Sequence, residues 1–139
     1  MRPGTLPVPL IAGFGEAAAL AALDHDKRDR TCREQQRAAL KAFEGINFQL
    51  NGDLEKTISH TLNISVNDLD SEATMLSLKG IAELSNGSAC TSASYTPSHV
   101  LKAMGFDDDR IQSAIRLSWC HMTEDVPWKE IAERVAALQ

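Results

Sequence analysis

A long run of helix-forming residues is the feature that most constrains this fold. The stretch Leu10–Phe43 consists mainly of Ala, Leu, Glu, Gln, Lys and Arg, the residues with the highest helix propensity. Gly45 follows and is a usual helix stop. Gly13, Gly15 and the polar run 24–27 are the points where such a helix would kink or divide in two. The sequence therefore predicts a long N-terminal helical segment with an interruption.

Alternation of apolar and polar side chains then predicts short strands. The pattern is present at 46–50, where Ile, Phe and Leu alternate, and more clearly at 61–67. It returns at 114–119, and we expect a further short strand at 81–85. Strands of this length pair most readily in an antiparallel sheet with short connections.

Capping signals place helices between and after these strands. Ser71 is a candidate N-cap for a helix that stops at Gly80. Thr96-Pro97 predicts the start of a short helix, and the aspartates at 107–109 favour the start of another. An amphipathic helix is expected from about Glu124 to Leu138.

The order of elements indicates the fold class α+β. A long N-terminal helical segment is followed by a small antiparallel sheet covered by helices. We expect residues 1–139 to form one domain, with 1–44 as lead-in and long helical segment and 45–139 as the α+β part.

Composition excludes several classes of function. The net charge of −5 mixes acidic and basic residues and leaves no electrostatic footprint for direct nucleic-acid binding. No apolar run predicts a membrane span or a signal peptide, so we expect a cytoplasmic protein. Cys32, Cys90 and Cys120 lie too far apart for a zinc motif, so no metal site is expected. Their odd number does not favour disulfides in a reducing compartment.

The segment 86–96 carries the most suggestive chemistry. Its side chains are small or polar, and a single thiol, that of Cys90, lies near the middle. A sulfur shuttle needs such an accessible thiolate, because the sulfur must be collected at one place and delivered at another. From composition alone the bland interpretation, a loop cysteine without a role, is favoured.

Motifs around this segment resemble those of the group I cysteine desulfurases. Ser88-Ala89-Cys90-Thr91-Ser92 with Pro97-Ser98-His99-Val100-Leu101 is similar to that family's cysteine loop. The resemblance extends to Arg2-x-Gly4-Thr5, Leu62-Asn63-Ile64-Ser65 and Ile115-Arg116-Leu117-Ser118, in the family's order.

The resemblance implies the C-terminal domain of a fold-type I enzyme that uses pyridoxal phosphate. Such an enzyme takes sulfur from L-cysteine, releases L-alanine and leaves a persulfide, here on Cys90, for transfer to an acceptor protein. The cofactor handles the electrons while the protein supplies position and electrostatics. A homodimer is implied when the protein is full length.

Arg116 is the candidate substrate-binding residue. Ile115 and Leu117 share one face of the predicted strand, so Arg116 points to the other face. A guanidinium binds both oxygens of a carboxylate, and the resemblance implies that this one holds the carboxylate of cysteine. A surface arginine paired with a nearby acid is the alternative. The resemblance also implies that Thr5, with Arg2 close by, contacts the cofactor phosphate of the neighbouring subunit.

Some features depart from the family pattern. None of the lysines stands in the family's cofactor-lysine motif, so we expect the cofactor-binding large domain to be absent and the chain alone to be inactive. Cys120 replaces a glycine, and we expect a partly buried thiol rather than a Cys-His pair with His121. Asn86-Gly87 and residues 119–122 resemble the desulfurases that serve DNA phosphorothioate modification. A non-catalytic sulfur-carrier or interaction module remains the alternative function.

Overall fold

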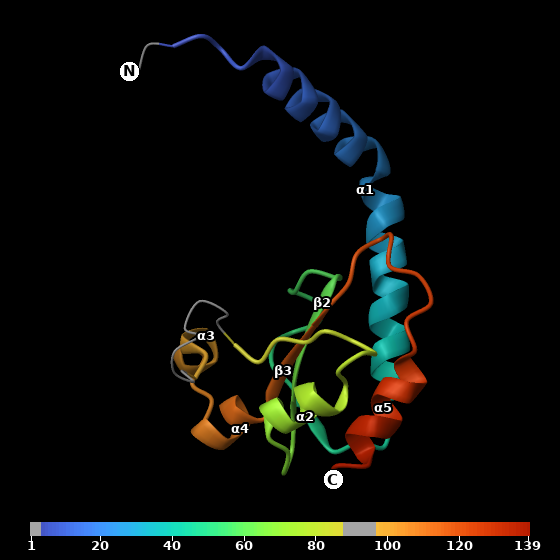
Figure 1. Ribbon diagram of the computed structural model, residues 1–139, viewed down its shortest axis with the longest axis vertical. Coiled ribbons are helices and arrows are strands. Elements are labelled where there is room, and N and C mark those ends of the chain that lie inside the picture. The colour runs from blue at the N-terminus through green and yellow to red at the C-terminus, as the bar shows by residue number, and fades with distance from the viewer. Residues whose placement is uncertain (1–3, 88–96) are drawn as a thin grey trace.

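The α+β class is confirmed by the computed structural model, which describes residues 4–87 and 97–139 (Figure 1). A long helix, α1, stands beside a three-stranded antiparallel sheet, and short helices cover that sheet. The elements are α1 (Val8–Ala42), β1 (Phe48–Leu50), β2 (Thr61–Val66), α2 (Ser71–Ser77), α3 (His99–Ala103), α4 (Asp108–Gln112), β3 (Ala114–Ser118) and α5 (Trp128–Ala136).

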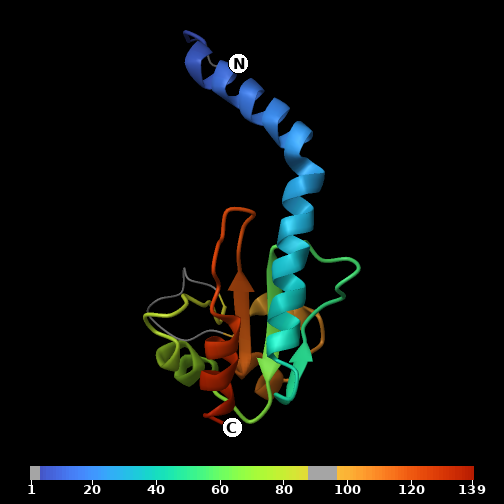
Figure 2. The ribbon, with the colours of Figure 1, turned by 90° about the vertical axis from the view of Figure 1, so that its right-hand side faces the viewer.

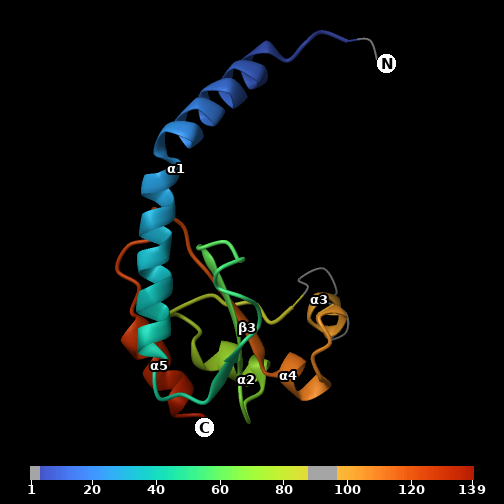
Figure 3. The same ribbon diagram turned by 180° about the vertical axis from the view of Figure 1, so that it is seen from behind.

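Helix α1 is continuous over 35 residues, so the predicted split into two helices is wrong. The predicted bend is present, because the dark-blue N-terminal part leans away from the part beside the sheet in all three ribbon views (Figures 1–3). The chain leaves the helix through Gly45, whose φ of 95° lies in the left-handed region that favours glycine. Because of the bend, only the C-terminal part of α1 packs on the rest of the molecule.

The register of the sheet decides which side chains share a face. Strand order is β1-β2-β3, with Leu62 opposite Leu117 and Ile64 opposite Ile115 on one face. On the other face Asn63 lies opposite Arg116. The predicted alternation at 61–67 and 114–119 is confirmed, and it gives the sheet one apolar and one polar face.

Helices α1 and α5 cover the apolar face, as the turned view shows (Figure 2). Phe43, which follows the last residue of α1, and Val135 from α5 are fully buried there together with the strand residues. Trp119 and Trp128 pack edge to face, with ring centroids 5.5 Å apart. Burial of these apolar side chains drives the association of the long helix with the sheet.

Helices α3 and α4 lie over the polar face. A small apolar cluster of Leu101, Ile111 and Ala114 anchors them there. The predicted helix start at Asp107–Asp109 is confirmed, since the Asp107 carboxylate accepts a hydrogen bond from the backbone N–H of Arg110 at 2.9 Å.

Two predicted boundaries are wrong by one or a few residues. Helix α2 is capped by Asp70 instead of Ser71, because the Asp70 carboxylate accepts hydrogen bonds from the N–H groups of residues 72 and 73. Helix α5 begins at Trp128 instead of about residue 124, since Asp125 has a positive φ of 48° that a helix does not allow.

Two other sequence predictions also fail. The segment 81–85 is not a strand: the N–H groups of Ile81 and Ala82 bond back to the carbonyl of Leu78, and Ser85 alone forms a bridge, to Arg116. Ser98, and not Thr96-Pro97, caps α3, with its hydroxyl accepting from the N–H of Leu101. Within residues 4–87 and 97–139, no helix has the length and apolar character needed to cross a membrane.

Candidate functional site

Arg116 lies on the polar face of β3 with its side chain exposed, as alternation predicts. Its backbone N–H donates to the carbonyl of Ser85 at 2.7 Å, and its carbonyl accepts from the Ser85 N–H at 3.2 Å. The backbone of Arg116 is thereby fixed between two chain segments. Among the residues that the structure describes, no acidic side chain forms an ion pair with this guanidinium, so the alternative of a paired surface arginine is not supported.

A cavity of about 240 Å³ opens beside Arg116. Asn51 and Asn63 line it from the sheet, and Val100, Leu101 and Met104 line it from α3. The remaining lining residues are Asn86, Gly87 and Ser98. These three stand on the two sides of the segment 88–96. Cys90 itself lies outside the described residues, and so does Arg2.

A network of buried polar side chains holds in place the residues that line this cavity on the side of the sheet. The Asn51 amide, which is 8% exposed, donates to Oδ1 of Asn63 at 2.8 Å and to Oγ of Ser65 at 2.7 Å. The Asn51 side-chain oxygen accepts from Nε of Arg110 at 2.8 Å, and the Ser65 hydroxyl donates to the Arg110 carbonyl at 2.6 Å. Asn63, which faces the cavity next to Arg116, is therefore held by a chain of satisfied hydrogen bonds.

Arg110 is the residue that ties α4 to the edge strand. Its Nη2 donates to the carbonyl of Leu50 at 2.7 Å, and its guanidinium carbon lies 3.8 Å from the centre of the Phe106 ring. The role of Arg110 was missed at the level of sequence. Its partners are 59 and 60 positions away, and the preceding aspartates indicate only a helix start.

Thr5 lies in the exposed lead-in before α1, at the end of the chain that projects away from the sheet (Figures 1 and 3). Thr5 is not among the residues that line the Arg116 cavity. Its contact with a cofactor phosphate in a neighbouring subunit stays a prediction.

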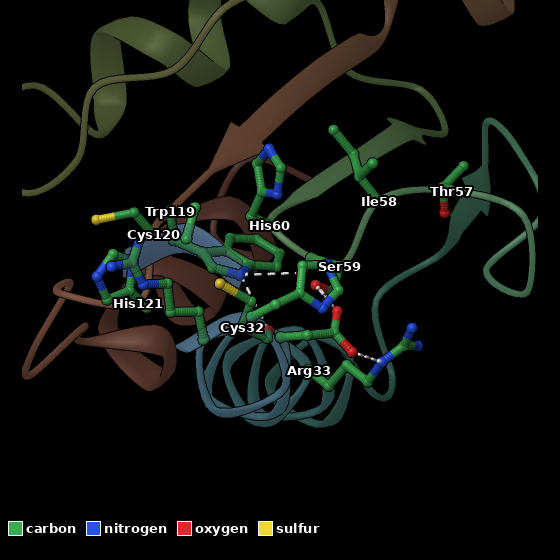
Figure 4. A pocket seen from close by; sticks show the side chains of 13 residues that line it. Cys32, Arg33, Thr57, Ile58, Ser59, His60, Trp119, Cys120 and His121 are labelled. Carbon is green, nitrogen blue, oxygen red and sulfur yellow. Dashed lines mark hydrogen bonds and ion pairs between the residues drawn. The ribbon is translucent and has the colours of Figure 1, made fainter. Parts of the chain in front are cut away.

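A larger cavity, of about 560 Å³, lies between α1, the segment before β2 and the residues after β3 (Figure 4). The Asp29 carboxylate lines this cavity. It accepts hydrogen bonds from the Ser59 hydroxyl at 2.7 Å and from Nε of Arg33 at 2.7 Å. The Ser59 hydrogen bond, followed by that from Arg33, lowers the pKa of Asp29. Trp119 also lines this cavity, and its Nε1 donates hydrogen bonds to the carbonyls of Cys32 and Ser59.

Two thiols in this cavity have opposite environments. Cys32 is buried, and burial raises its pKa, with smaller contributions from Cys120 and Asp29. Cys120 is exposed, so the expectation of a partly buried thiol is wrong. Hydrogen bonds from the Thr123 hydroxyl at 3.5 Å and the Met122 N–H at 3.4 Å lower the Cys120 pKa. Across the described parts of the chain, no three His, Cys, Asp or Glu side chains form a metal-binding group.

The class of protein follows from comparison with known families. The profile "Aminotransferase class-V" matches residues 1–127. The chain therefore belongs to the class-V aminotransferase family.

Curated relatives identify the similar proteins more closely. The chain is 44% identical over 129 residues to cysteine desulfurase IscS of Shewanella piezotolerans, and 43% identical over 129 residues to that of Photorhabdus laumondii. In both cases the match covers 90% of this chain and 31% of the relative. The chain thus spans about a third of the length of these relatives.

Solved structures share the arrangement of most of this chain. A NIFS-like protein superposes with a TM-score of 0.74 at 26% identity, over 99% of this chain and 36% of its own. DndA from Streptomyces lividans superposes with a TM-score of 0.61 at 35% identity, over 86% of this chain and 33% of its own.

Proposed function

We propose that this chain is the C-terminal part of a cytoplasmic cysteine desulfurase that takes sulfur from L-cysteine as a persulfide on Cys90. L-Alanine is released and the sulfur passes to an acceptor protein. In the net step the C–S bond of cysteine breaks and an S–S bond to Cys90 forms, so that the cysteine sulfur becomes the outer atom of the persulfide. The carbon that loses sulfur gains a proton, which balances the proton lost from the Cys90 thiol, and leaves as the methyl group of alanine. Support comes from the IscS relatives at 44% and 43% identity.

One observation carries the assignment to particular residues. Arg116 and residues on both sides of the Cys90 segment, Gly87 and Ser98, line the same cavity of about 240 Å³. A substrate carboxylate bound by the Arg116 guanidinium would therefore lie close to where the thiol-bearing segment leaves and rejoins the fold. The amide of Asn63, whose Oδ1 is held by the Asn51 amide, faces the same small molecule.

The described residues do not fit pyridoxal phosphate by themselves. The cofactor of this enzyme class requires a lysine, and neither the Arg116 cavity nor the α1 cavity is lined by one. We therefore propose that residues 1–139 form a single domain that acts with a separate lysine-bearing cofactor domain. In a homodimer of the complete protein, Thr5 and Arg2 would approach the cofactor phosphate of the neighbouring subunit.

We further propose DNA phosphorothioate modification as the pathway that receives the sulfur. The resemblance at residues 86–87 and 119–122 favours it. The similar DndA structure, 35% identical to this chain, is a second support, although the IscS relatives are more similar, at 44% and 43% identity. Nucleic acid would be reached through an acceptor protein, since the net charge is −5.

Mass spectrometry of Cys90 tests the central assignment. The chain is incubated with L-cysteine and a catalytically active cofactor domain, and its cysteine peptides are analysed without reduction. We expect one added sulfur atom on Cys90, release of alanine in proportion, and neither product with Cys90→Ser. Sulfur that accumulates on Cys120 instead, or alanine release that persists at the normal rate in Cys90→Ser, would show that Cys90 is not the carrier.

A second measurement separates the enzyme fragment from a sulfur-carrier module. The chain alone, with added pyridoxal phosphate and cysteine, should release no alanine. Robust turnover by the isolated chain would contradict the need for a separate cofactor domain. A chain that accepts sulfur at Cys90 from a preformed persulfide, but never supports alanine release with any cofactor domain, would favour the carrier module.

A further inference from the structure

Arg110 dictates which way the amide groups of the buried polar network are turned. A side-chain amide has a donor end and an acceptor end, and its partners decide its direction. A guanidinium has donors only, so Nε of Arg110 must face the side-chain oxygen of Asn51, at 2.8 Å. The Asn51 nitrogen is thereby turned the other way, where it donates to Oδ1 of Asn63 at 2.8 Å and to Oγ of Ser65 at 2.7 Å.

Asn63 is the last member of this chain of hydrogen bonds. Its oxygen is occupied by Asn51, so its nitrogen, with two N–H donors, points away from Asn51. Within residues 4–87 and 97–139, no acceptor is hydrogen-bonded to this nitrogen. The Asn63 side chain is half-buried and lines the Arg116 cavity. The direction set at Arg110 therefore gives this cavity an amide with its donors available.

Asn63 and Arg116 are neighbours across the two strands. They are paired in the register of β2 and β3. The backbone N–H and carbonyl of Arg116 bond to Ser85, on the other side of β3, so Asn63 and Arg116 form a pair without direct backbone hydrogen bonds. Side chains lie closest in pairs of this kind. The Asn63 donors and the Arg116 guanidinium are therefore side by side at the cavity.

We propose that Asn63 is a second carboxylate-binding residue, and that Arg110 and Asn51 are positioning residues that turn its N–H donors towards the substrate. The inference rests on the proposed function for the identity of the substrate, and it narrows the substrate class. A carboxylate can accept from Arg116 and Asn63 together, whereas a carboxamide would place its own NH2 group against donors. The site therefore selects amino acids with a free carboxylate over their amides.

Asn51→Asp tests the direction of the amide with almost no change in shape. An aspartate accepts from Nε of Arg110 as the amide does, but it cannot donate to Asn63. Asn63 should therefore flip, with its nitrogen donating to the new carboxylate and its oxygen facing the cavity. The affinity for L-alanine, the unreactive product of the proposed reaction, should fall at least ~10-fold. The affinity for L-alaninamide should not fall, since the flipped oxygen accepts from its NH2 group.

Nuclear magnetic resonance of the isotope-labelled 139-residue chain measures these affinities. A ligand of this size is expected to bind with a Kd of about 1 mM or weaker, so L-alanine is titrated to about 100 mM. In the parent chain the side-chain NH2 signals of Asn63 should shift. Those of Asn67, an amide that bonds to Asn47 and does not line the cavity, should not. Asn63 signals that L-alanine leaves unchanged would overturn the proposal.

Two further variants separate the turning of the amide from the added charge. Asn67→Asp introduces the same charge away from the cavity and should leave both affinities unchanged. In an Asn63→Ala background, which lacks the amide to be turned, Asn51→Asp should weaken L-alanine no further. The same loss with and without the Asn63 amide would assign the effect to charge and overturn the proposal. Equal losses for L-alanine and L-alaninamide in Asn51→Asp would show a purely structural role.

Asn63→Ala alone decides the matter if Asn51→Asp does not fold, because it leaves the bond between Asn51 and Arg110 intact. It should weaken L-alanine at least ~10-fold, and an unchanged affinity would overturn the proposal. None of these measurements uses Cys90 or a cofactor domain. A chain that binds L-alanine through Asn63 but forms no persulfide would contradict only the proposed function. Persulfide formation without any response of Asn63 would contradict only this inference.

Discussion

The two faces of the sheet use the same strands for opposite purposes. On one face Leu62, Ile64 and Leu117 are buried under α1 and α5 and carry no polar atoms. On the other face Asn63 and Arg116 line a cavity, and Asn63 accepts a hydrogen bond from the buried Asn51 amide. Apolar burial supplies stability without requiring exact partners, whereas polar groups give direction and become costly when a partner is lost. The comparison predicts that stability depends on the first face and substrate binding on the second.

The largest effect is expected from the apolar face. Ile64→Ala removes a fully buried side chain at the centre of the sheet, and should lower the free energy of unfolding by about 2–5 kcal/mol. Urea unfolding followed by circular dichroism measures this. Ile58→Ala is the matched control, since Ile58 is 60% exposed and should change stability little. Equal losses in the two variants would break the comparison.

A smaller loss is expected from the polar face. Asn51→Ala removes the acceptor of Nε of Arg110 and one of the two hydrogen bonds of Oγ of Ser65, and should cost about 1–3 kcal/mol in unfolding free energy. Asn67→Ala removes an exposed amide that bonds Asn47 and Gln49, so it serves as the control with an effect below about 0.5 kcal/mol. If Asn51→Ala proves as harmless as Asn67→Ala, the polar network does not support the cavity.

The contrast between the faces also shows what the sequence can reveal. Alternation is a local property, so the strands and the outward direction of Arg116 follow directly from residues 61–67 and 114–119. The same alternation makes Ser65 look like a surface residue, yet α4 covers it completely. Its partner Arg110 lies 45 positions away, and no local pattern records that contact.

Boundaries and the site itself were predicted less completely than the elements. Asp70 and Ser71 are both good N-caps, and only the backbone conformation of Asp70 decides between them. The short strand expected at 81–85 does not form, because the N–H groups of Ile81 and Ala82 make turn hydrogen bonds around Gly80, whose φ is 85°. For the candidate site, the family resemblance predicts Arg116 and Cys90, whereas the asparagines beside Arg116 come together only when separate segments of the chain fold against one another.

The dependence of stability on pH tests the hydrogen bond that the Ser59 hydroxyl donates to Asp29 of α1. The lowered pKa of Asp29 means that the unfolded chain binds more protons between this value and the ordinary carboxyl value near 4. The contribution of Asp29 to stability should therefore be complete above the ordinary value and be lost as pH falls through the lowered one. Urea unfolding between pH about 2.5 and 6 should show this loss.

Two variants isolate the contribution of Asp29. Asn at position 29 cannot titrate, so Asp29→Asn should reduce the dependence of stability on pH in this range. Ser59→Ala removes the largest cause of the lowered pKa and should reduce it partially. A pH dependence that is unchanged in Asp29→Asn would assign the effect to other carboxylates.

The smallest effect on stability, and the sharpest test of the two-face comparison, is expected for Arg116→Ala. The side chain is exposed, and the bridge to Ser85 uses only backbone atoms, so the unfolding free energy should change by less than about 0.5 kcal/mol.

With an active cofactor domain, the same variant should raise the cysteine concentration needed for half-maximal alanine release, because the carboxylate loses its charged partner. Arg134→Ala, which removes an exposed arginine on α5, is the control and should leave that concentration unchanged. Arg116→Lys should restore binding only in part, since an ammonium group lacks the paired donors of a guanidinium. A large loss of stability in Arg116→Ala with normal use of cysteine would reverse the roles assigned to the two faces.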